Sequence, residues 1–259
     1  MSLVKTEFDN GVLTIILCDE ENRNALSVGL TSELAKTLDE AELNSEVRAI
    51  VLTNSGHVFC AGADLSERSS NKGVDSSAKP GDPLEIFGRF RKSSKPYIGK
   101  IAGHCVAGGM GIAAAMDISI ATEEAKFGFT EVRIGVAPAI ISVLCLPKMR
   151  PSEASEAFLR GNRFSASEAV RMGLINASVP AEKLDAAVEE VLSDIKAGGP
   201  EAIAAAKQLI LRVPHMQTDE AFSWTSKMSA DLFKGDEAQE GMRAYLEKRS
   251  PSWIKEQSD

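Results

Sequence analysis

The sequence predicts an α/β protein whose sheet is at least partly parallel, and three observations support that prediction. Apolar segments of strand length alternate with helical segments or long loops, which favours crossover connections between parallel strands. The 259 residues, 44% of them hydrophobic, can fill a sizeable core. Gly198-Gly199-Pro200 is the clearest break in the chain, and only helical segments follow it. We therefore expect a core over residues 1–197 and a helical region over residues 198–259.

Most strands are expected in the first half of the chain. The segments LVKTEF and VLTIILC flank the turn pair Asn10-Gly11 and predict a hairpin. Ser27 is a suitable cap for a helix that runs to about Leu43, because apolar residues recur there at helical spacing. Further strands are expected in the apolar segments RAIVLTN, KPYIGKIAG, ISIAT and KFGF.

A long polar segment, residues 66–85, separates two of these strands. It is rich in Ser, Gly, Pro and charged residues and has hardly any large apolar side chain. Structureless loops of that length are uncommon inside compact domains, and they are usually lids, binding loops or disordered segments. The sequence leaves open whether this loop is an active-site flap or a passive insertion.

Helices are expected from Pro151 onward. SEASEAFLRG and SASEAVRMG predict two short helices, the second with a capping box formed by Ser165 and Glu168. Longer helices are expected at about 181–197, 201–212, 218–233 and 236–248. The last three carry more large apolar residues than a small appendage needs. Some of these residues are expected to cover the core or a neighbouring subunit: Phe222, Trp224, Met228, Leu232, Phe233, Met242 and Tyr245.

Composition argues against nucleic acid and membranes as partners. With 29 basic and 37 acidic residues, the chain has no basic field that would hold a phosphate backbone or an anionic bilayer. Its longest uncharged stretches are shorter than the about 20 residues of a membrane span, and the N-terminus has no secretory signal. The four cysteines form no C-x-x-C pair, which is typical of reduced thiols in a cytoplasmic protein. The three histidines are scattered, so no metal site is expected.

Two turns built from small residues point to an active site. Four glycines between residues 103 and 111 precede an alanine-rich helical segment, in an order that fits neither a dinucleotide fingerprint nor a P-loop. Such a helix start offers free N–H groups to negative charge, although it also suits a merely tight strand-to-helix crossing. The segment HVFCAGADLSE similarly ends an apolar strand in small residues. If both turns meet at one oxygen, they form an oxyanion hole.

Five segments together resemble the enoyl-CoA hydratase/isomerase family, the crotonases. They are ENRNAL, FCAGADL, AGHCVAGGMGIAAAMDISIA, FGFTEVRIGVAP and EGMRAYLEKR, and they occur in that family's order and spacing over nearly the whole chain. The resemblance implies a spiral core of repeated ββα units, followed by C-terminal helices that take part in forming a homotrimer, commonly within a homohexamer of two trimers. It also implies an acyl-CoA thioester as substrate, with CoA as part of that substrate and no separate cofactor.

The resemblance further assigns roles to single residues. The oxyanion donors would be the backbone N–H groups of Ala63 and Gly108, and the acid and base would be Glu131. Ser66 stands where relatives often have lysine, so one contact to CoA is in doubt. Tyr245 and Lys248 would lie near the adenine and 3′-phosphate of CoA, within reach of a neighbouring subunit's ligand. Substrate or CoA contacts are implied at Ala25, Leu26, Ala61, Asp64, Leu65, Gly111, Tyr245 and Lys248.

Glu131 is the only catalytic carboxylate that these motifs supply. Hydratases of the family usually have a second glutamate three residues after the oxyanion glycine, where this chain has Gly111. A small residue there is expected to widen the acyl pocket. The apolar neighbours of Glu131 favour a raised pKa and proton transfer, whereas pairing with Arg133 or another surface group is the alternative.

A lone glutamate fits two enzymes. In a hydratase, Glu131 would deprotonate the water that adds to C3 and return the proton to C2. In a Δ3,Δ2-enoyl-CoA isomerase it would carry a proton between C2 and C4. The stretch FTEVRIGVAPAIIS looks most like hydratases of actinobacterial type, some of which act on bulky acyl groups, and we favour the hydratase. More remote alternatives are a non-catalytic acyl-CoA or RNA-binding protein and a dehalogenase or hydrolase of the same fold.

Overall fold

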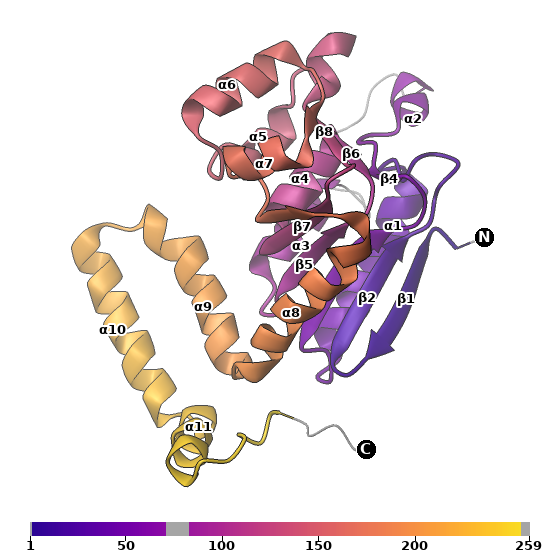
Figure 1. Cartoon of the computed structure of the whole chain (residues 1–259). Helices are drawn as coiled ribbons and strands as arrows, with labels where there is room; N and C mark the ends of the chain where they lie inside the picture. The colour runs from indigo at the N-terminus through magenta and orange to yellow at the C-terminus, as the bar shows by residue number, and fades with distance from the viewer. Residues whose placement is uncertain (1, 71–82, 255–259) are drawn as a thin grey trace.

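The computed structural model describes residues 2–70 and 83–254, and it confirms the predicted α/β core of repeated ββα units (Figure 1). Along the chain, a long strand of one sheet is followed by a short strand of a second sheet and then by a helix. This order repeats three times, so that the chain winds forward as a spiral.

The six-stranded sheet has the order β1-β2-β3-β5-β7-β10. Its first two strands form the predicted antiparallel hairpin around Asn10-Gly11, where both residues have positive φ. The other neighbours pair in parallel, as the crossover connections predict. The strands are β1 (Val4–Asp9), β2 (Val12–Leu17), β3 (Ala49–Asn54), β5 (Tyr97–Ile101), β7 (Ile118–Thr122) and β10 (Ala177–Val179).

The second sheet has four short strands in the order β4-β6-β8-β9. The first three run parallel, with Cys105 opposite both Cys60 and Phe127, whereas β9 pairs antiparallel to β8. The carboxyl ends of three neighbouring strands therefore lie at one edge of this sheet. The strands are β4 (Val58–Cys60), β6 (His104–Val106), β8 (Lys126–Gly128) and β9 (Phe164–Ser165).

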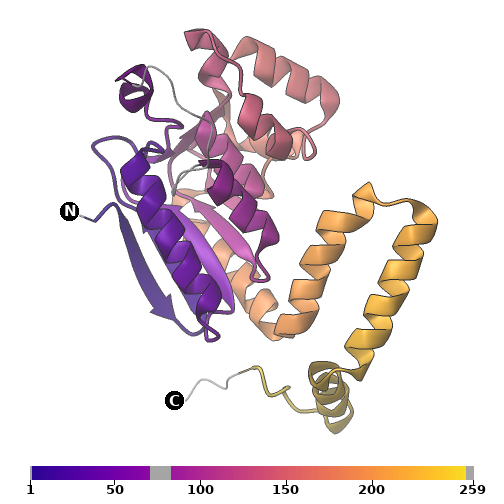
Figure 2. The ribbon, with the colours of Figure 1, turned by 180° about the vertical axis from the view of Figure 1, so that it is seen from behind.

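Both faces of the large sheet are covered. On one face, Ala49 and Val51 of β3 pack with Leu184 and Val188 of α8 (Leu184–Ala197). On the other face, alternate β3 residues join the main core, to which α1 (Val28–Leu43) and α4 (Gly108–Ala115) also contribute. Figures 1 and 2 show α8 on one side of the sheet and α1 with α3 on the other. All six residues of β3 are buried, as expected for a central parallel strand.

The prediction of a loop over residues 66–85 is wrong at both ends. Helix α2 (Leu65–Ser70) occupies its start and α3 (Pro83–Lys92) begins before its end, while residues 71–82 lie outside the described part.

The apolar segment after β8 contains two further helices that were not expected, the 3-10 helix η1 (Thr130–Ile134) and α5 (Ala139–Cys145). The capping box of Ser165 and Glu168 is present. Next to it lie α6 (Pro151–Arg160), α7 (Ala166–Met172) and the 3-10 helix η2 (Ala181–Lys183).

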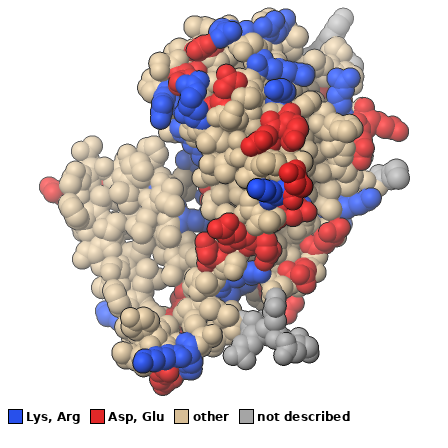
Figure 3. Space-filling view, in the orientation of Figure 1, with Lys and Arg blue, Asp and Glu red and all other residues tan. Residues whose placement is uncertain are grey.

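The C-terminal residues 198–254, which we call the arm, extend away from the sheets (Figure 1). The arm consists of α9 (Pro200–Arg212), the 3-10 helix η3 (Val213–His215), α10 (Thr218–Lys234) and α11 (Asp236–Glu247). Large apolar side chains on it face solvent, among them Ile210 (76% exposed) and Phe222 (71% exposed). Figure 3 shows few charged side chains on the near face of α9 and α10.

Lys207 attaches α9 to the core. Its ammonium group is buried, pairs with Asp117 at 2.7 Å and donates to the backbone carbonyl of Lys95 at 2.6 Å. The ring of Tyr97 lies 5.4 Å from the same nitrogen, and Asp117 also accepts from the Tyr97 N–H at 2.7 Å. A buried cation needs such partners, so Lys207 fixes the start of the arm against the edge of the large sheet.

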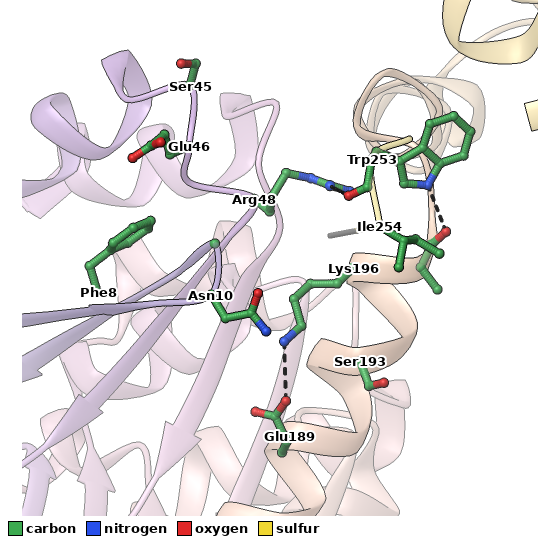
Figure 4. Close-up of a pocket in the computed structure, with 12 residues that line it drawn as sticks. Phe8, Asn10, Ser45, Glu46, Arg48, Glu189, Ser193, Lys196, Trp253 and Ile254 are labelled. Carbon is green, nitrogen blue, oxygen red and sulfur yellow. Dashed lines mark hydrogen bonds and ion pairs between the residues drawn. The ribbon is translucent and has the colours of Figure 1, made fainter. Parts of the chain in front are cut away.

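The end of the arm returns to the core beside the hairpin turn, where Figure 4 shows it lining a cavity of about 610 Å³. The Arg48 guanidinium donates to the carbonyl of Gly198 at 2.7 Å and to that of Trp253 at 3.1 Å. The Trp253 indole N–H donates to the carbonyl of Ala197 at 3.1 Å. These three bonds, which we call the Arg48 clasp, join both ends of the arm to the start of β3.

Candidate active site

The candidate site lies where β4, β6 and β8 end. These strands are parallel neighbours, so the segments that follow them meet at one edge of the small sheet. Ala63 follows β4, Gly108 follows β6, and Glu131 follows β8. The backbone also links two of these segments, because the Ala107 N–H donates to the Gly128 carbonyl at 2.9 Å. Three segments that are far apart in the sequence thus begin at one edge of the small sheet.

Both turns have unusual backbone conformations. Gly62 has a φ of +90°, which glycine adopts readily. Ala107, the residue before α4, has φ 50° and ψ −123°, a combination that is strained for a residue with a Cβ. Backbone strain of this kind concentrates at functional sites, where the surrounding structure enforces it. At Ala107 it aims the start of α4 toward the first turn.

The two turns are in contact. A Cβ added to Gly62 would lie 2.9 Å from the Gly108 nitrogen and 2.6 Å from the Ala107 Cβ. A Cβ added to Gly108 would lie 3.6 Å from the Ala63 nitrogen. The N–H groups of Ala63 and Gly108 donate to no acceptor among the described residues. Two neighbouring unpaired N–H groups at a helix start can together bind one negatively charged oxygen.

Glu131 lies in η1, one residue after its start, and its carboxylate is half-buried. Its Oε2 atom is fully buried and has no hydrogen-bond partner within the described part of the chain. Burial raises the pKa of this carboxyl above its ordinary value. The alternative of a pair with Arg133 is wrong, because that guanidinium donates to the carbonyls of Gly161 and Arg160.

The Glu131 charge acts on the Cys145 thiol of α5. Burial, with a contribution from the Glu131 charge, raises the pKa of the Cys145 thiol to about 12. The same thiol donates to the Met110 carbonyl of α4 at 3.7 Å. A buried carboxylate oxygen without a hydrogen-bond partner is a candidate acid and base.

Gly111 does not open a wider pocket, and the expectation that it would is wrong. A Cβ at this position would lie 2.4 Å from Cγ2 of Ile141 and 3.1 Å from the Phe87 ring. Both side chains are buried, and they come from α5 and α3. The volume beside Gly111 is therefore filled by apolar groups, with no room for a second carboxylate.

A cleft of about 660 Å³ leads away from Ala63. It brings together several residues that the resemblance assigns to CoA contacts, namely Ala25, Ala61, Asp64 and Leu65. Leu26 is buried next to them, and its N–H donates to the Gly62 carbonyl at 2.7 Å. The roles of these residues stay predictions, but the structure places them around one opening.

Tyr245 and Lys248 are not brought to this cleft within one chain. Both lie at the end of α11, where Tyr245 is 84% exposed and Lys248 ends the helix with a positive φ. Figure 1 shows α11 at the far end of the molecule from β4 and α4. Contact with CoA by these two residues would require the ligand of a neighbouring subunit.

Sequence reasoning missed Phe87, Ile141 and two arginines of the cleft, Arg23 and Arg163. Phe87 lies in a helix hidden behind a polar segment, and Ile141 lies in an apolar stretch without clear periodicity. The only sequence signal for Arg163 was its position as a charged residue directly before a short strand.

The described residues contain no group of three or more His, Cys, Asp or Glu that could hold a metal ion. No helix in the described ranges is long and apolar enough to cross a membrane.

Comparisons with known proteins relate the whole chain to one family. A family model described as enoyl-CoA hydratase/isomerase matches residues 7–257. The chain is 33% identical over 236 residues to the enoyl-CoA hydratase EchA19 of Mycobacterium tuberculosis, covering 89% of this chain and 88% of that one. It is 32% identical to the mevalonyl-coenzyme A hydratase sidH of Aspergillus fumigatus over 248 residues, or 93% and 91%. The crystal structure of an enoyl-CoA hydratase from Mycobacterium smegmatis matches with a TM-score of 0.85 at 28% identity, over 97% of this chain and 98% of that one.

Proposed function

The chain belongs to the enoyl-CoA hydratase/isomerase family, and we propose that it is an enoyl-CoA hydratase, which adds water across the trans-2 double bond of an acyl-CoA thioester. The observation that carries this proposal is the buried, unpaired Oε2 of Glu131 in the segment that follows β8, together with the two contacting turns that follow β4 and β6. The names of the relatives support hydration, although their acyl groups differ.

The backbone N–H groups of Ala63 and Gly108 would bind the thioester carbonyl oxygen. When water adds to C3, negative charge moves through C2 to this oxygen and forms an enolate. Two fixed amide dipoles stabilise that charge without having to reorganise. Removal of one such donor typically lowers the rate by about 100-fold to 1000-fold. Small residues at both turns allow the two backbone segments to approach each other closely and would leave these N–H groups open to a ligand.

Glu131 would perform both proton transfers. As a carboxylate it accepts a proton from water while the water oxygen bonds to C3. The resulting carboxylic acid then gives a proton to C2, which collapses the enolate and regenerates the carboxylate. A raised pKa suits this cycle, because the group must be both a base and an acid near neutral pH. No separate cofactor takes part, since CoA is bound within the substrate.

The runner-up is a Δ3,Δ2-enoyl-CoA isomerase. It is favoured by the packing of Ile141 and Phe87 against Gly111, which leaves Glu131 without a second carboxylate to position water. In that reaction Glu131 would remove a proton from C4 or C2 and return it to the other carbon. The same residues thus serve both reactions, and the product distinguishes them.

The test follows turnover of a trans-2-enoyl-CoA and of the matching 3-enoyl-CoA by absorbance and mass. For a hydratase, the trans-2 substrate gains the mass of one water, and Glu131→Gln lowers kcat/KM by about 100-fold or more. Migration of the double bond without any gain in mass would establish the isomerase instead. Absence of turnover with retained CoA binding would leave the non-catalytic acyl-CoA-binding protein, and an RNA gel shift would test its RNA-binding form.

We also propose that the protein is a homotrimer or a hexamer of two trimers in the cytoplasm. Exposed apolar side chains on the arm, such as Phe222 and Phe233, would be covered in such an assembly. Tyr245 and Lys248 would then reach the CoA of a neighbouring subunit. Size-exclusion chromatography with light scattering tests the assembly, and a monomer at working concentration would count against it.

A further inference from the structure

The 3-10 helix η1, which carries Glu131, has little packing of its own. None of its five residues, Thr130–Ile134, is fully buried, and both Val132 and Ile134 are exposed. The Oε2 atom of Glu131 is nevertheless enclosed, without a hydrogen-bond partner in the described part of the chain. A segment with so few buried side chains is held weakly by its own packing, so contacts outside η1 must fix the position of Glu131.

The segment before η1 is held by β9 and α6. Phe127 of β8 pairs antiparallel with Phe164 of β9. The fully buried ring of Phe129 packs on the ring of Phe158 in α6, with 4.1 Å between the ring centroids. These contacts lead the chain from β8 along α6, and they stop one residue before η1 begins. They fix the start of η1 and leave its far end to other groups.

Arg133 attaches the far end of η1 to α6. Its Nε donates to the Gly161 carbonyl at 2.6 Å, and its Nη2 donates to the Arg160 carbonyl at 3.3 Å. Helix α6 ends at Arg160, so both carbonyls belong to the group that has no partner within the helix. A guanidinium suits them, because the negative end of the helix dipole favours a cation and because hydrogen bonds from a charged donor are strong.

Gly161 allows η1 and α6 to approach each other closely. It has a φ of +56°, and a Cβ added there would lie 2.5 Å from Cγ2 of Val132 and 3.4 Å from Cγ of Arg133. The stem of Arg133 therefore lies against the end of α6 while its guanidinium reaches two carbonyls there. Among the described residues, no carboxylate pairs with Arg133, although Glu131 is only two positions away in the sequence.

We propose that Arg133 is a positioning residue for Glu131, because it fixes η1 to the end of α6. The two carbonyls occupy the guanidinium, and the Glu131 carboxylate stays without a cation partner. An arginine paired with Glu131 would lower the pKa of that carboxyl and weaken it as a base, whereas burial raises the pKa. The inference rests on the proposed function only in taking Glu131 as the proton-transfer group, a role that the hydratase and the isomerase share.

The test replaces Arg133 with methionine, which keeps a long apolar stem but has no N–H group to donate. A misplacement of about 1 Å can cost about 100-fold in rate, so kcat of Arg133→Met should fall by about 10-fold to 100-fold. KM should change by less than about threefold, because the turns that would bind the thioester are unaltered. Arg133→Lys should recover part of kcat, since an ammonium group can still donate to one of the two carbonyls.

The pKa of Glu131 is the readout that a mere loss of stability would not change. Carbon-13 NMR of labelled glutamate carboxyls, with Glu131→Gln to assign the signal, measures this pKa without any substrate. In the wild type it should lie above the ordinary value, because the carboxyl is partly buried. In Arg133→Met it should fall toward the ordinary value, since a loosened η1 admits water to Oε2. The acid limb of the kcat profile should then move to lower pH.

Two further variants complete the experiment. Arg160→Met is the matched control, because the Arg160 side chain pairs with Glu156 and only its backbone carbonyl accepts from Arg133. It should leave kcat and the measured pKa unchanged. Gly161→Ala should reproduce the effect of Arg133→Met from the side of α6, because its Cβ would push Val132 away and a positive φ strains alanine.

If Arg133→Met matches the Arg160→Met control in kcat and in the pKa of Glu131, the inference is wrong. A fall in kcat with an unchanged pKa of Glu131 would also overturn it, because the carboxylate would then have kept its surroundings. A lowered pKa in Arg133→Met, together with a wild type that turns over no enoyl-CoA, would support the positioning role and remove the proposed function. Hydration that Arg133→Met leaves unaffected would do the reverse.

Discussion

The core and the arm are stabilised in different ways. In the core, β3 is buried along its whole length and large side chains such as Phe59, Phe90 and Phe127 are fully enclosed. In the described part of the arm, only Gly199, Lys207 and Ala244 are buried. The core thus has a hydrophobic interior of its own. The arm, which consists of three amphipathic helices arranged in a row, has none. The arm depends on its attachment to the core and on whatever surface covers its apolar residues.

The candidate site belongs entirely to the core side of this division. Its two turns and Glu131 follow strands whose pairing is fixed by the buried sheet. The residues of the arm that resemble CoA contacts, Tyr245 and Lys248, are exposed and distant. Changes in the core should therefore alter chemistry and global stability, and changes in the arm should alter attachment and assembly.

Lys207→Met should break the connection between the two regions and have the largest effect on stability. It removes the ion pair with Asp117 and the bond to the Lys95 carbonyl, and we expect a loss of about 3 kcal/mol in the free energy of unfolding. Chemical denaturation measures the loss, and hydrogen exchange should show α9 opening first. Lys227→Met is the control, because its pair with Asp231 is largely exposed and should contribute little to the free energy of unfolding. Equal effects of the two variants would contradict the anchoring role of Lys207.

Gly111→Ala should act on the core alone. The added Cβ would lie 2.4 Å from Ile141, so overpacking should lower the free energy of unfolding by about 2 kcal/mol. The matched control is Gly88→Ala in α3, where nothing lies within 4 Å of an added Cβ. That helix should gain about 0.5 to 1 kcal/mol, since alanine is the better helix former. A neutral Gly111→Ala would mean that Ile141 can move aside, and the double variant Gly111→Ala with Ile141→Ala checks this directly.

Trp253→Phe should loosen the end of the arm and leave the core intact. The phenyl ring cannot donate to the Ala197 carbonyl, and the lost bond should lower stability by about 1 kcal/mol. Limited proteolysis is the readout, with faster cleavage expected near residues 248–252. Cleavage inside the core at the same rate as in the arm would show that the two regions are not separable in this way.

Glu131→Gln should have the smallest effect on stability, and the effect should be favourable. Because burial raises the folded-state pKa of Glu131 above its ordinary value of 4.5, ionisation above that pH favours the unfolded chain. The amide removes this effect, so stability at pH 7 should rise by less than about 1 kcal/mol. The gain should disappear below about pH 4.5, where the carboxyl is protonated in both states. Thermal unfolding between pH 4 and pH 8 measures the difference, and a gain that grows as the pH falls would contradict the raised pKa.

Local sequence signals predicted much of the core. The pair Asn10-Gly11 gives the hairpin because both residues tolerate positive φ, and Ser165 with Glu168 gives a capping box because their side chains reach the free N–H groups. The break at Gly198-Gly199 separates α8 from α9 as expected. These features depend on residues that are close in the sequence, so they can be predicted from the sequence.

Features that depend on distant contacts were not predictable. Nothing near Gly111 in the sequence indicates that Phe87 and Ile141 fill the space beside it. Alanine rarely adopts a positive φ, so nothing in the residue type of Ala107 indicates the φ of 50° with which it donates to the Gly128 carbonyl. Likewise, the sequence around Lys207 is typical of an exposed helix face, and only the fold brings Asp117 next to it.

The Arg48 clasp gives the molecule a site for a label far from its chemistry. Arg48 precedes β3, so the clasp lies at the amino ends of the parallel strands, whereas the cleft opens beyond the carboxyl ends of β4 and β6. Ser252 is exposed next to Trp253. A fluorophore attached through Ser252→Cys would report on opening of the clasp without entering the cleft, which lies at the opposite end of the strands.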